Sequence, residues 1–428
     1  MPLLALLRRL RSWIVKLLLL LAMLLFLGAS TVASGDPLER VRRFTRQQEF
    51  EYVGWTLDAL LFKLSAFSVG AAGYLPEPDR QDLVRSYAEL IVEAGQLEAR
   101  LAEIYGDPLA DDPMASAAVT ERQLDEARDR LRQLLPLVET VVQDQVAVAL
   151  QDLGLDAAGA ILPPVAFHFT QLPMGFIVSP RRVIQQDANL SLNAGLTIEE
   201  QVRLESEVES SLDVSTLVVP IGGVGIYPTM VLESGSLTWV FDTVAHEWVH
   251  NYLTLRPLGL NYETSPELRT MNETTASILG GEIGRMVLER YYPDLLPPPP
   301  APEAQAPPAP SPEPPRFDFR AEMHETRLQV DRLLAEGEIE EAEAYMEARR
   351  QVFWENGYRI RRINQAYFAF YGAYADQPGG AAGEDPVGAA VRELRRRIAS
   401  PAEFLQTIAW MSDYSDLQTA LARVPTTP

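Results

Sequence analysis

Apolar residues recur at helical spacing through the segment that follows the amino terminus. Leu83, Tyr87 and Leu90 follow this spacing, and the segment 131–142 repeats it. A period near 3.6 residues indicates amphipathic helices that bury one apolar face. Proline-containing breaks divide the segment into three parts. We therefore predict three long helices between residues 36 and 155, packed as a bundle on the rest of the chain.

The pattern changes near residue 160, where short runs of β-branched and aromatic residues are broken by proline and glycine. Short runs of this kind are typical of strands. We predict a small mixed sheet within residues 160–240, with one helix near residues 197–211. The predicted strands cover residues 165–169, 175–178, 217–221, 226–231 and 237–241.

Helical spacing returns beyond residue 242 and is interrupted by one segment of extreme composition. Residues 297–315 contain eleven prolines in nineteen positions, together with Ala, Glu, Gln and Ser. This composition forms extended, solvated chain, so we predict a linker or a looped-out insertion. The whole pattern predicts an α+β fold that is predominantly helical. The later helices are predicted at residues 243–256, 266–292, 317–334, 338–374 and in a tail from residue 387.

The amino terminus combines a basic flank with an apolar run. Four basic residues between positions 8 and 16 precede eleven consecutive apolar residues, 17–27, in a charge-free stretch that ends at residue 35. This order keeps the amino terminus inside and exports the remainder of the chain. We predict an extracytoplasmic protein held by a single uncleaved transmembrane helix. The alternative is a signal peptide cleaved among the small residues 28–34, which would release a secreted protein.

Charge and cysteine content exclude several classes of function. The 428-residue chain has a formal net charge of −22 and a pI near 4.7, so it repels the phosphate backbone of nucleic acids and anionic lipid surfaces. Apolar residues make up 47% of the chain, which is enough for a substantial core. The chain has no cysteine, so disulfides and thiolate nucleophiles are excluded. Any zinc ion must be held by histidine and carboxylate.

Two of the four histidines lie four residues apart on a predicted helix. His246 and His250 are at i and i+4, which places both imidazoles on one face where they can bind one metal ion. Glu247 follows the first histidine and in this pattern serves as the general base toward the activated water. Asp242 and Thr243 supply capping chemistry at the predicted helix start. The alternative is an amphipathic helix whose histidines and glutamate only face water.

A catalytic zinc ion requires a third protein ligand and an open position for water. The extended motif that continues to a glycine and a third histidine fails here, because those positions hold Leu253 and Arg256. A carboxylate must therefore be the third ligand, and we predict Glu273 on the next helix. Small residues on that helix would allow it to pack closely against the histidine-bearing helix. The other carboxylates considered are Glu263, Glu267 and Glu282, and the small residues are Ala276, Ser277, Gly280 and Gly281.

Several stretches of the chain resemble parts of known zinc peptidases. Residues 246–250 and 272–276 are similar to the His-Glu-x-x-His and Asn-Glu-x-x-Ala motifs of the gluzincin peptidases. Residues 363–374 resemble the Asn-Asn-Ala…Tyr stretch of the bacterial putative aminopeptidase family. Asn364 and Gln365 stand at the Asn-Asn pair, so the chain departs from the family pattern at the second position.

The resemblance implies a zincin-like core, made of a small mixed sheet, the metal-binding helix and a glutamate-bearing helix. It implies that His246, His250 and Glu273 bind Zn²⁺. It also implies that Glu247 is the catalytic base, that Tyr374 stabilises the oxyanion, and that the activity is that of an aminopeptidase. The three tyrosines of this late helix share one face, so the alternative is that they pack in a core.

In such peptidases a strand ahead of the metal-binding helix pairs with the substrate backbone. Residues 217–231 occupy this place, and Gly222, Gly223 and Gly225 would let a substrate approach closely. The alternative is a plain glycine-containing hairpin. We assign residues 1–35 to a signal or membrane anchor, 36–155 to a helical region, 156–296 to the zincin-like catalytic core, 297–315 to the linker, and 316–428 to a C-terminal helical region that completes the site.

These features predict an exported zinc metallopeptidase that hydrolyses peptide or protein substrates and contacts the membrane through its N-terminal helix. One alternative is a zinc amidase that acts on non-peptide or cell-wall substrates. The other is a membrane-anchored, non-catalytic scaffold whose zinc is structural. An open coordination position separates the enzymes from the scaffold, because structural zinc sites are closed.

Overall fold

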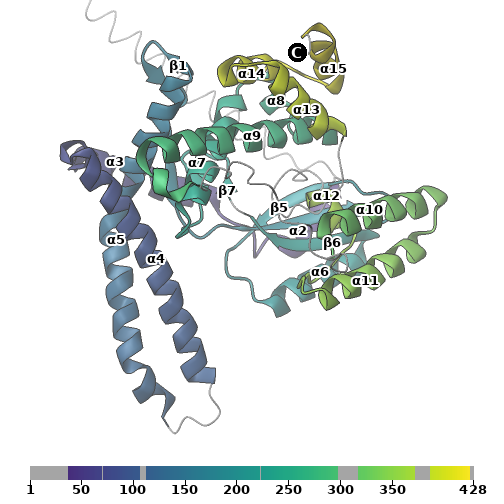
Figure 1. Ribbon diagram of the computed structural model, residues 1–428. Helices are drawn as coiled ribbons and strands as arrows, with labels where there is room; N and C mark the ends of the chain where they lie inside the picture. The colour runs from purple at the N-terminus through teal and green to yellow at the C-terminus, as the bar shows by residue number, and fades with distance from the viewer. Residues whose placement is uncertain are drawn as a thin grey trace, which may run out of the picture. The chain divides into compact units, whose positions relative to one another are not determined.

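The computed structural model describes residues 37–69, 71–106, 112–221, 223–296, 317–371 and 386–424. The chain forms two compact units, residues 1–48 and 49–428. The first unit contains helix α2 (Pro37–Thr45). The second is mixed α+β and predominantly helical with small sheets, which confirms the predicted fold class at this level (Figure 1). The predicted amino-terminal anchor and the proline-rich linker lie outside the described residues.

Helices α4 (Glu77–Gly106) and α5 (Pro113–Asp152) form a long hairpin, as Figure 1 shows. Apolar residues three and four positions apart form the seam between them, which is the spacing that packs two helices along their length. Asp112 caps α5 by accepting a hydrogen bond from the Ala115 N–H at 2.9 Å. The seam includes Tyr87, Leu90 and Ala94 of α4 and Leu124, Ala127 and Leu131 of α5.

The first of the three predicted long helices is divided. Helix α2 ends at Thr45, and α3 (Tyr52–Val69) begins separately and leads to the short turn η1 (Ala71–Tyr74). Glu51 caps the start of α3. Its carboxylate accepts hydrogen bonds from the backbone N–H groups of Val53 and Gly54, at 3.1 and 2.6 Å. The prediction of three long helices is therefore wrong for the first and confirmed for the other two.

The predicted strands form more than one sheet, so the prediction of a single sheet is wrong. Strand β4 (Met174–Pro180) pairs antiparallel with β5 (Ala188–Leu192) and with β6 (Val214–Pro220). The helix predicted in this region is α6 (Ile198–Ser211), which begins with a capping box and lies against β6.

A second sheet contains both parallel and antiparallel pairs. Strand β8 (Thr229–Val231) pairs parallel with β3 (Phe167–Phe169) and antiparallel with β7 (Gly223–Val224). Strands β1 (Asp156–Ala157) and β2 (Ala160–Ile161) form a separate antiparallel pair. Strand β7 is therefore at one edge of its sheet.

Helices α7 (Leu237–Leu253) and α9 (Pro266–Tyr291) lie side by side and are joined through α8 (Pro257–Leu260) (Figure 1). Helix α9 is close to the prediction. Helix α7 begins at the cap Ser236, so the predicted strand at 237–241 is instead its first turns. The prediction of a cap at residues 242 and 243 is wrong for the same reason.

The helix predicted at residues 338–374 is interrupted. Helix α11 (Ile339–Glu355) ends before Gly357, whose φ of 91° is in the left-handed region that commonly ends helices. Helix α12 (Gln365–Tyr371) then begins where Asn364 accepts the N–H of Tyr367 at 2.9 Å. The prediction of one continuous helix is therefore wrong. The remaining elements are η2 (Pro293–Leu295), α10 (Phe319–Glu336), α13 (Pro386–Arg397), α14 (Pro401–Ile408) and α15 (Tyr414–Arg423).

Buried apolar side chains form two cores within residues 49–428. The larger core joins α4, α5, α7, α9 and the C-terminal helices. The smaller core lies between the β4–β6 pair and helices α10 to α12, and includes Ile177, Leu217 and Phe353. The helices that carry the predicted metal ligands thus belong to the larger core, and α12 belongs to the smaller one.

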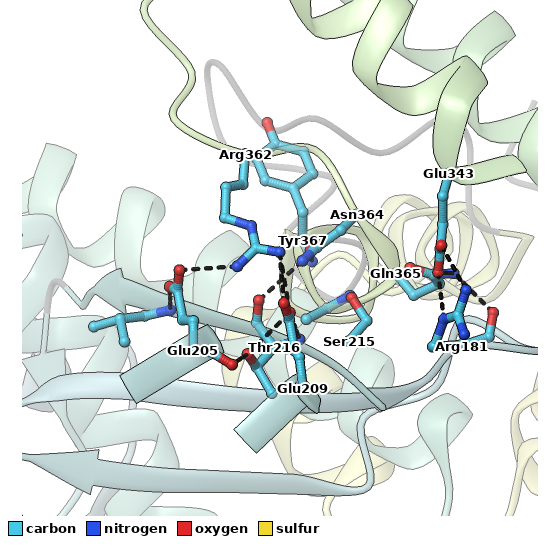
Figure 2. Close-up of polar contacts among 12 residues, drawn as sticks. Arg181, Glu205, Glu209, Ser215, Thr216, Glu343, Arg362, Asn364, Gln365 and Tyr367 are labelled. Carbon is cyan, nitrogen blue, oxygen red and sulfur yellow. Dashed lines mark hydrogen bonds and ion pairs between the residues drawn. The ribbon is translucent and has the colours of Figure 1, made fainter. Parts of the chain in front are cut away.

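Carboxylates of α6 cover the outer edge of strand β6. Within the described residues β6 pairs with β4 alone, which leaves the N–H groups of Thr216 and Val218 directed away from the sheet. Glu209 accepts the Thr216 N–H at 2.8 Å (Figure 2). Glu205 accepts the Val218 N–H at 2.7 Å. These bonds satisfy backbone donors that an edge strand would otherwise expose.

The segment ahead of α12 covers the carbonyl groups of the same edge. Asn364 donates to the Thr216 carbonyl at 2.9 Å (Figure 2). Arg361 donates to the Val218 carbonyl at 3.1 Å. Pro220, the next residue on this edge, has no N–H to satisfy. The edge of β6 is therefore closed to pairing with another strand.

Candidate metal centre

Helix α7 is fixed in rotation by its buried side. Phe241, Val244 and Trp248 are at most 2% exposed. Burying side chains of this size contributes about 1.5–3 kcal/mol each, so turning the helix about its axis would be costly. This orientation leaves His246 and His250 on the partly open side, with 14% and 16% of their side chains exposed.

Helix α9 approaches α7 closely at two glycines. A Cβ on Gly280 would lie 2.8 Å from the Asp242 carbonyl oxygen and 3.1 Å from the Cα of His246. A Cβ on Gly284 would lie 2.0 Å from Asp242 Oδ1. A Cβ on Gly281 would meet nothing within 4 Å. The close contact expected from the small residues of α9 is therefore present at Gly280 and absent at Gly281.

The structure brings the three predicted ligands together. The Nε2 atoms of His246 and His250 are 3.0 Å apart. Oε2 of Glu273 lies 3.6 Å from the first of these nitrogens and 3.5 Å from the second. All three ligand atoms lie within 4.8 Å of one another. Two imidazole nitrogens and one carboxylate oxygen form a common ligand set of catalytic zinc.

The polar atoms of this group fit a cation. Oε2 of Glu273 is buried and has no hydrogen-bond partner, and the residue is only 3% exposed. Leaving a buried polar atom unpaired costs about 1–3 kcal/mol, and more for a charged group. The facing Nε2 atoms of His246 and His250 also repel unless a proton or a cation lies between them. A divalent ion would satisfy all three atoms at once, so the residues fit Zn²⁺.

Two further side chains contact these ligands and were not predicted to do so. Nδ1 of His250 donates to Oδ1 of Asn272 at 2.8 Å, which leaves the Nε2 lone pair available to a metal. The hydroxyl of Tyr262 donates to Oε1 of Glu273 at 2.5 Å. The contact of Asn272 with the site could have been expected from the sequence, because Asn272 directly precedes Glu273. Tyr262 lies in a loop, where no periodicity points to it.

Burial and neighbouring charges shift the pKa values of the site. Burial raises the pKa of Glu247, against the opposing effect of the two imidazoles. Burial acts to lower the pKa of His250, but the negative charge of Glu273 outweighs it and raises the pKa to about 9. Burial acts to raise the pKa of Glu273, but His250 and His246 lower it below its usual range. The metal-free site therefore holds a proton that a bound metal ion would displace.

Strand β7 lies directly against the predicted base. A Cβ on Gly223 would lie 2.2 Å from Oε1 of Glu247, and one on Gly225 would lie 3.2 Å from the Cβ of His250. Glycine at these positions allows the strand to approach α7, and Glu247 is only 6% exposed. The structure thus gives Gly223 and Gly225 a contact with α7, while Gly222 lies outside the described residues. The contact of these glycines with a substrate stays a prediction.

The predicted substrate strand, residues 217–231, is divided between two sheets. Its first part belongs to β6, whose outer edge is closed by the side chains of α6 and of the segment ahead of α12. Its middle part is β7, an edge strand beside Glu247. Only β7 therefore has both the edge position and the proximity that pairing with an extended substrate requires.

The other carboxylates considered as ligands lie outside this group. Glu263 pairs with Arg269 at 2.7 Å, and Glu282 pairs with Arg395 at 2.9 Å. Glu267 is exposed in the first turn of α9. Glu273 is the one carboxylate that the described residues bring to both histidines.

Two of the three tyrosines near the end of the predicted 338–374 helix are described, and both pack in a core, as the alternative interpretation predicts. Tyr367 and Tyr371 pack against each other with ring centroids 4.6 Å apart, in the smaller core. Asn364, from the stretch that resembles the aminopeptidase family, binds the edge of β6. Tyr374 lies outside the described residues, so its role as an oxyanion donor stays a prediction.

Asp242 is a carboxyl group whose burial has a measurable cost. It is half-buried against Gly284, and burial raises its pKa to about 6, with a smaller opposing effect of Arg285. The folded protein therefore binds this proton more tightly than the unfolded chain. The resulting stability is fully present below about pH 4 and is lost as the pH rises through 6.

Asp242→Asn is expected to raise the free energy of unfolding of the metal-free protein by about 1–3 kcal/mol near pH 7.5, because the buried charge is removed. The gain is expected to be much smaller near pH 4.5, where the folded wild type is already protonated. Urea unfolding at both pH values in the presence of a chelator measures the difference. A gain of equal size at both values would show that the buried charge is not its cause.

Among the described residues no helix has both the length and the apolar character needed to cross a bilayer. The predicted anchor within residues 1–35 lies outside them. Comparison of the chain with protein families, with curated proteins and with solved structures found no match. The assignment of a function therefore rests on the residues of the chain and on their arrangement.

Proposed function

We propose that this protein is a zinc-dependent peptidase of the gluzincin type, with His246, His250 and Glu273 as the zinc ligands. One observation carries the proposal: two imidazole nitrogens and one carboxylate oxygen, from two helices, lie close enough to bind one metal ion. The carboxylate oxygen is buried and has no hydrogen-bond partner. Zn²⁺ bound there would supply a Lewis acid that polarises the peptide carbonyl and acidifies water. The zincin-like core of this proposal consists of α7, α9 and the sheet formed by β3, β8 and β7.

Glu247 is the general base in this proposal. Its carboxylate takes a proton from the attacking water as the new C–O bond forms, and delivers a proton to the amine as the peptide C–N bond breaks. Its pKa is raised by burial, which moves the group toward the working pH, where a base is most effective. Gly223 and Gly225 allow β7 and the residue that follows it to lie close to this carboxylate, so a segment paired with β7 would lie near it.

The substrate in this proposal is a peptide or an extended protein segment added to the edge of β7. Backbone pairing fixes its direction while leaving side-chain selection to the surrounding surface. The protein would act outside the cytoplasm, tethered through residues 1–35, as the basic flank and apolar run predict. Aminopeptidase activity is the narrower form of the proposal.

The alternatives differ in what the site must contain. A zinc amidase would use the same ligands and base on a non-peptide or cell-wall amide. A scaffold with structural zinc would need a closed site with four protein ligands. Within the described residues the ligand group has three members, which favours a catalytic site over a structural one.

Metal removal tests the proposal. The full-length protein is expected to bind about one zinc ion per chain and to cleave a mixed peptide library. Chelation is expected to abolish cleavage, and added Zn²⁺ is expected to restore it, because the proposed reaction requires a metal ion at the three ligands. Mass spectrometry of the products distinguishes one-residue ladders, expected of an aminopeptidase, from internal cuts. Cleavage confined to cell-wall fragments would favour the amidase, and a protein that binds no metal would refute both.

A further inference from the structure

We infer that Tyr262 is a positioning residue that holds the carboxylate of Glu273 with one oxygen directed toward the metal ion. The inference deepens the proposed function and rests on it for the identity of the ion. The starting observation is a short hydrogen bond, 2.5 Å from the Tyr262 hydroxyl to Oε1 of Glu273.

The two oxygens of Glu273 have different surroundings. Oε1 accepts the hydrogen bond of Tyr262. Oε2 faces the Nε2 atoms of His246 and His250 at 3.6 and 3.5 Å and has no hydrogen-bond partner. Rotation of the carboxylate out of this orientation would break the short bond to Tyr262, which costs free energy at a buried carboxylate. The tyrosine therefore holds Oε2 toward the two imidazoles.

The loop that carries Tyr262 is anchored to both ligand-bearing helices. A Cβ on Gly259 would lie 2.1 Å from the Leu253 carbonyl oxygen of α7, so the loop lies directly against the end of that helix. The carbonyl of Leu258 accepts a hydrogen bond from Asn272 of α9 at 3.4 Å. The N–H of Tyr262 donates to the Gly259 carbonyl at 3.1 Å. Tyr262 is thus held in a fixed relation to the ligands rather than on a free loop.

The ring of Tyr262 is also held from two sides. Its centroid lies 6.3 Å from that of the His250 ring, with the planes perpendicular. The guanidinium of Arg269 lies 5.8 Å from the ring centroid and is itself paired with Glu263 at 2.7 Å. A nearby positive charge strengthens a phenol as a hydrogen-bond donor, because it stabilises negative charge on the oxygen.

These contacts predict a specific effect on the metal. A hydrogen bond to a carboxylate is stronger than one between neutral groups, so this bond holds the Glu273 carboxylate firmly in one orientation. Partners that hydrogen-bond to metal ligands typically change metal affinity by about 10–100-fold when they are removed. Tyr262→Phe removes only the hydroxyl, so it isolates this bond from the packing of the ring.

Tyr262→Phe is expected to weaken Zn²⁺ binding by about 10–100-fold, measured by competition with a chromophoric chelator. It is also expected to change the visible absorption spectrum of the Co²⁺-loaded protein, because that spectrum reports the ligand field. Tyr252→Phe is the matched control. It removes a hydroxyl from the helix that carries His250, at a ring that packs against Trp248 and whose hydroxyl donates to no described residue, and it is expected to leave affinity and spectrum unchanged.

A double variant tests whether the effect passes through Glu273. In a Glu273→Ala background, Tyr262→Phe is expected to cause no further loss of metal affinity, since the hydrogen-bond acceptor is gone. A wild type that binds neither Zn²⁺ nor Co²⁺ would refute the proposed function itself. A wild type that binds both, with a Tyr262→Phe variant of equal affinity and spectrum, would refute this inference alone. A Tyr262→Phe variant with lower stability and lower affinity but an unchanged Co²⁺ spectrum would show that Tyr262 has only a structural role. That outcome would also refute this inference.

Discussion

Glu247→Gln is expected to lower peptide hydrolysis by about 10²–10⁴-fold while the protein keeps its metal. Glutamine has nearly the shape of glutamate but cannot accept a proton from water at neutral pH. Glu247 is outside the group of three ligand atoms, so the zinc content should not change. The kcat for a peptide identified in the library digest, together with elemental analysis of the same preparation, measures both expectations.

Glu282→Gln is the matched control for this substitution. Glu282 is on α9, where it pairs with Arg395 at 2.9 Å instead of with the ligand histidines. The same chemical change there is expected to leave kcat unaltered. An unaltered kcat in Glu247→Gln would contradict the role of base, and loss of zinc from that variant would show that Glu247 takes part in holding the metal.

The local parts of the site could be predicted from the sequence because they depend on residues a few positions apart. His246 and His250 share a face of any α-helix that contains both. The contribution of Gly280 also followed from local reasoning, since small residues on one helix face allow another helix to approach. Each of these predictions needed only the period of the helix and the chemistry of the side chains.

The start of α7 shows where local reasoning was wrong. Four of the five residues 237–241 are apolar and four of the five are aromatic or β-branched, which is typical of a buried strand. In the structure Ser236 accepts a hydrogen bond from the Trp239 N–H at 3.4 Å, and Phe241 is buried in the larger core as part of a helix. A run of five such residues does not distinguish a strand from the first turns of a buried helix.

Contacts between distant parts of the chain that belong to no recognisable motif could not be predicted. Arg361 binds Glu205 at 2.6 Å although 156 positions separate them. The stretch around Asn364 resembled part of a catalytic domain, yet its described contacts close the edge of β6. Tyr262 reaches Glu273 from a loop. A single sequence contains no signal for such pairs, because they depend on how whole elements pack.

Gly280→Ala and Gly281→Ala are expected to change stability in opposite directions, although the residues are adjacent on α9. A Cβ at Gly281 meets nothing within 4 Å, so alanine should stabilise the helix by about 1 kcal/mol. A Cβ at Gly280 meets the Asp242 carbonyl oxygen at 2.8 Å and the His246 Cα at 3.1 Å. Both are backbone atoms of α7, so the helices must separate, at a cost of about 1–3 kcal/mol. Urea unfolding of the two variants measures both changes.

The same substitutions connect packing to the metal site. Gly280 lies two turns after Glu273 on the face of α9 that meets α7, so separating the helices at Gly280 also moves Glu273 away from His246. Zinc affinity is therefore expected to fall by about tenfold in Gly280→Ala and to stay unchanged in Gly281→Ala. Equal affinities in both variants would mean that the ligands hold their positions without this contact. Lower affinity in Gly280→Ala alone would show that the absence of a Cβ at Gly280 sets the distance between the two helices. This distance would then fix the geometry of the ligands.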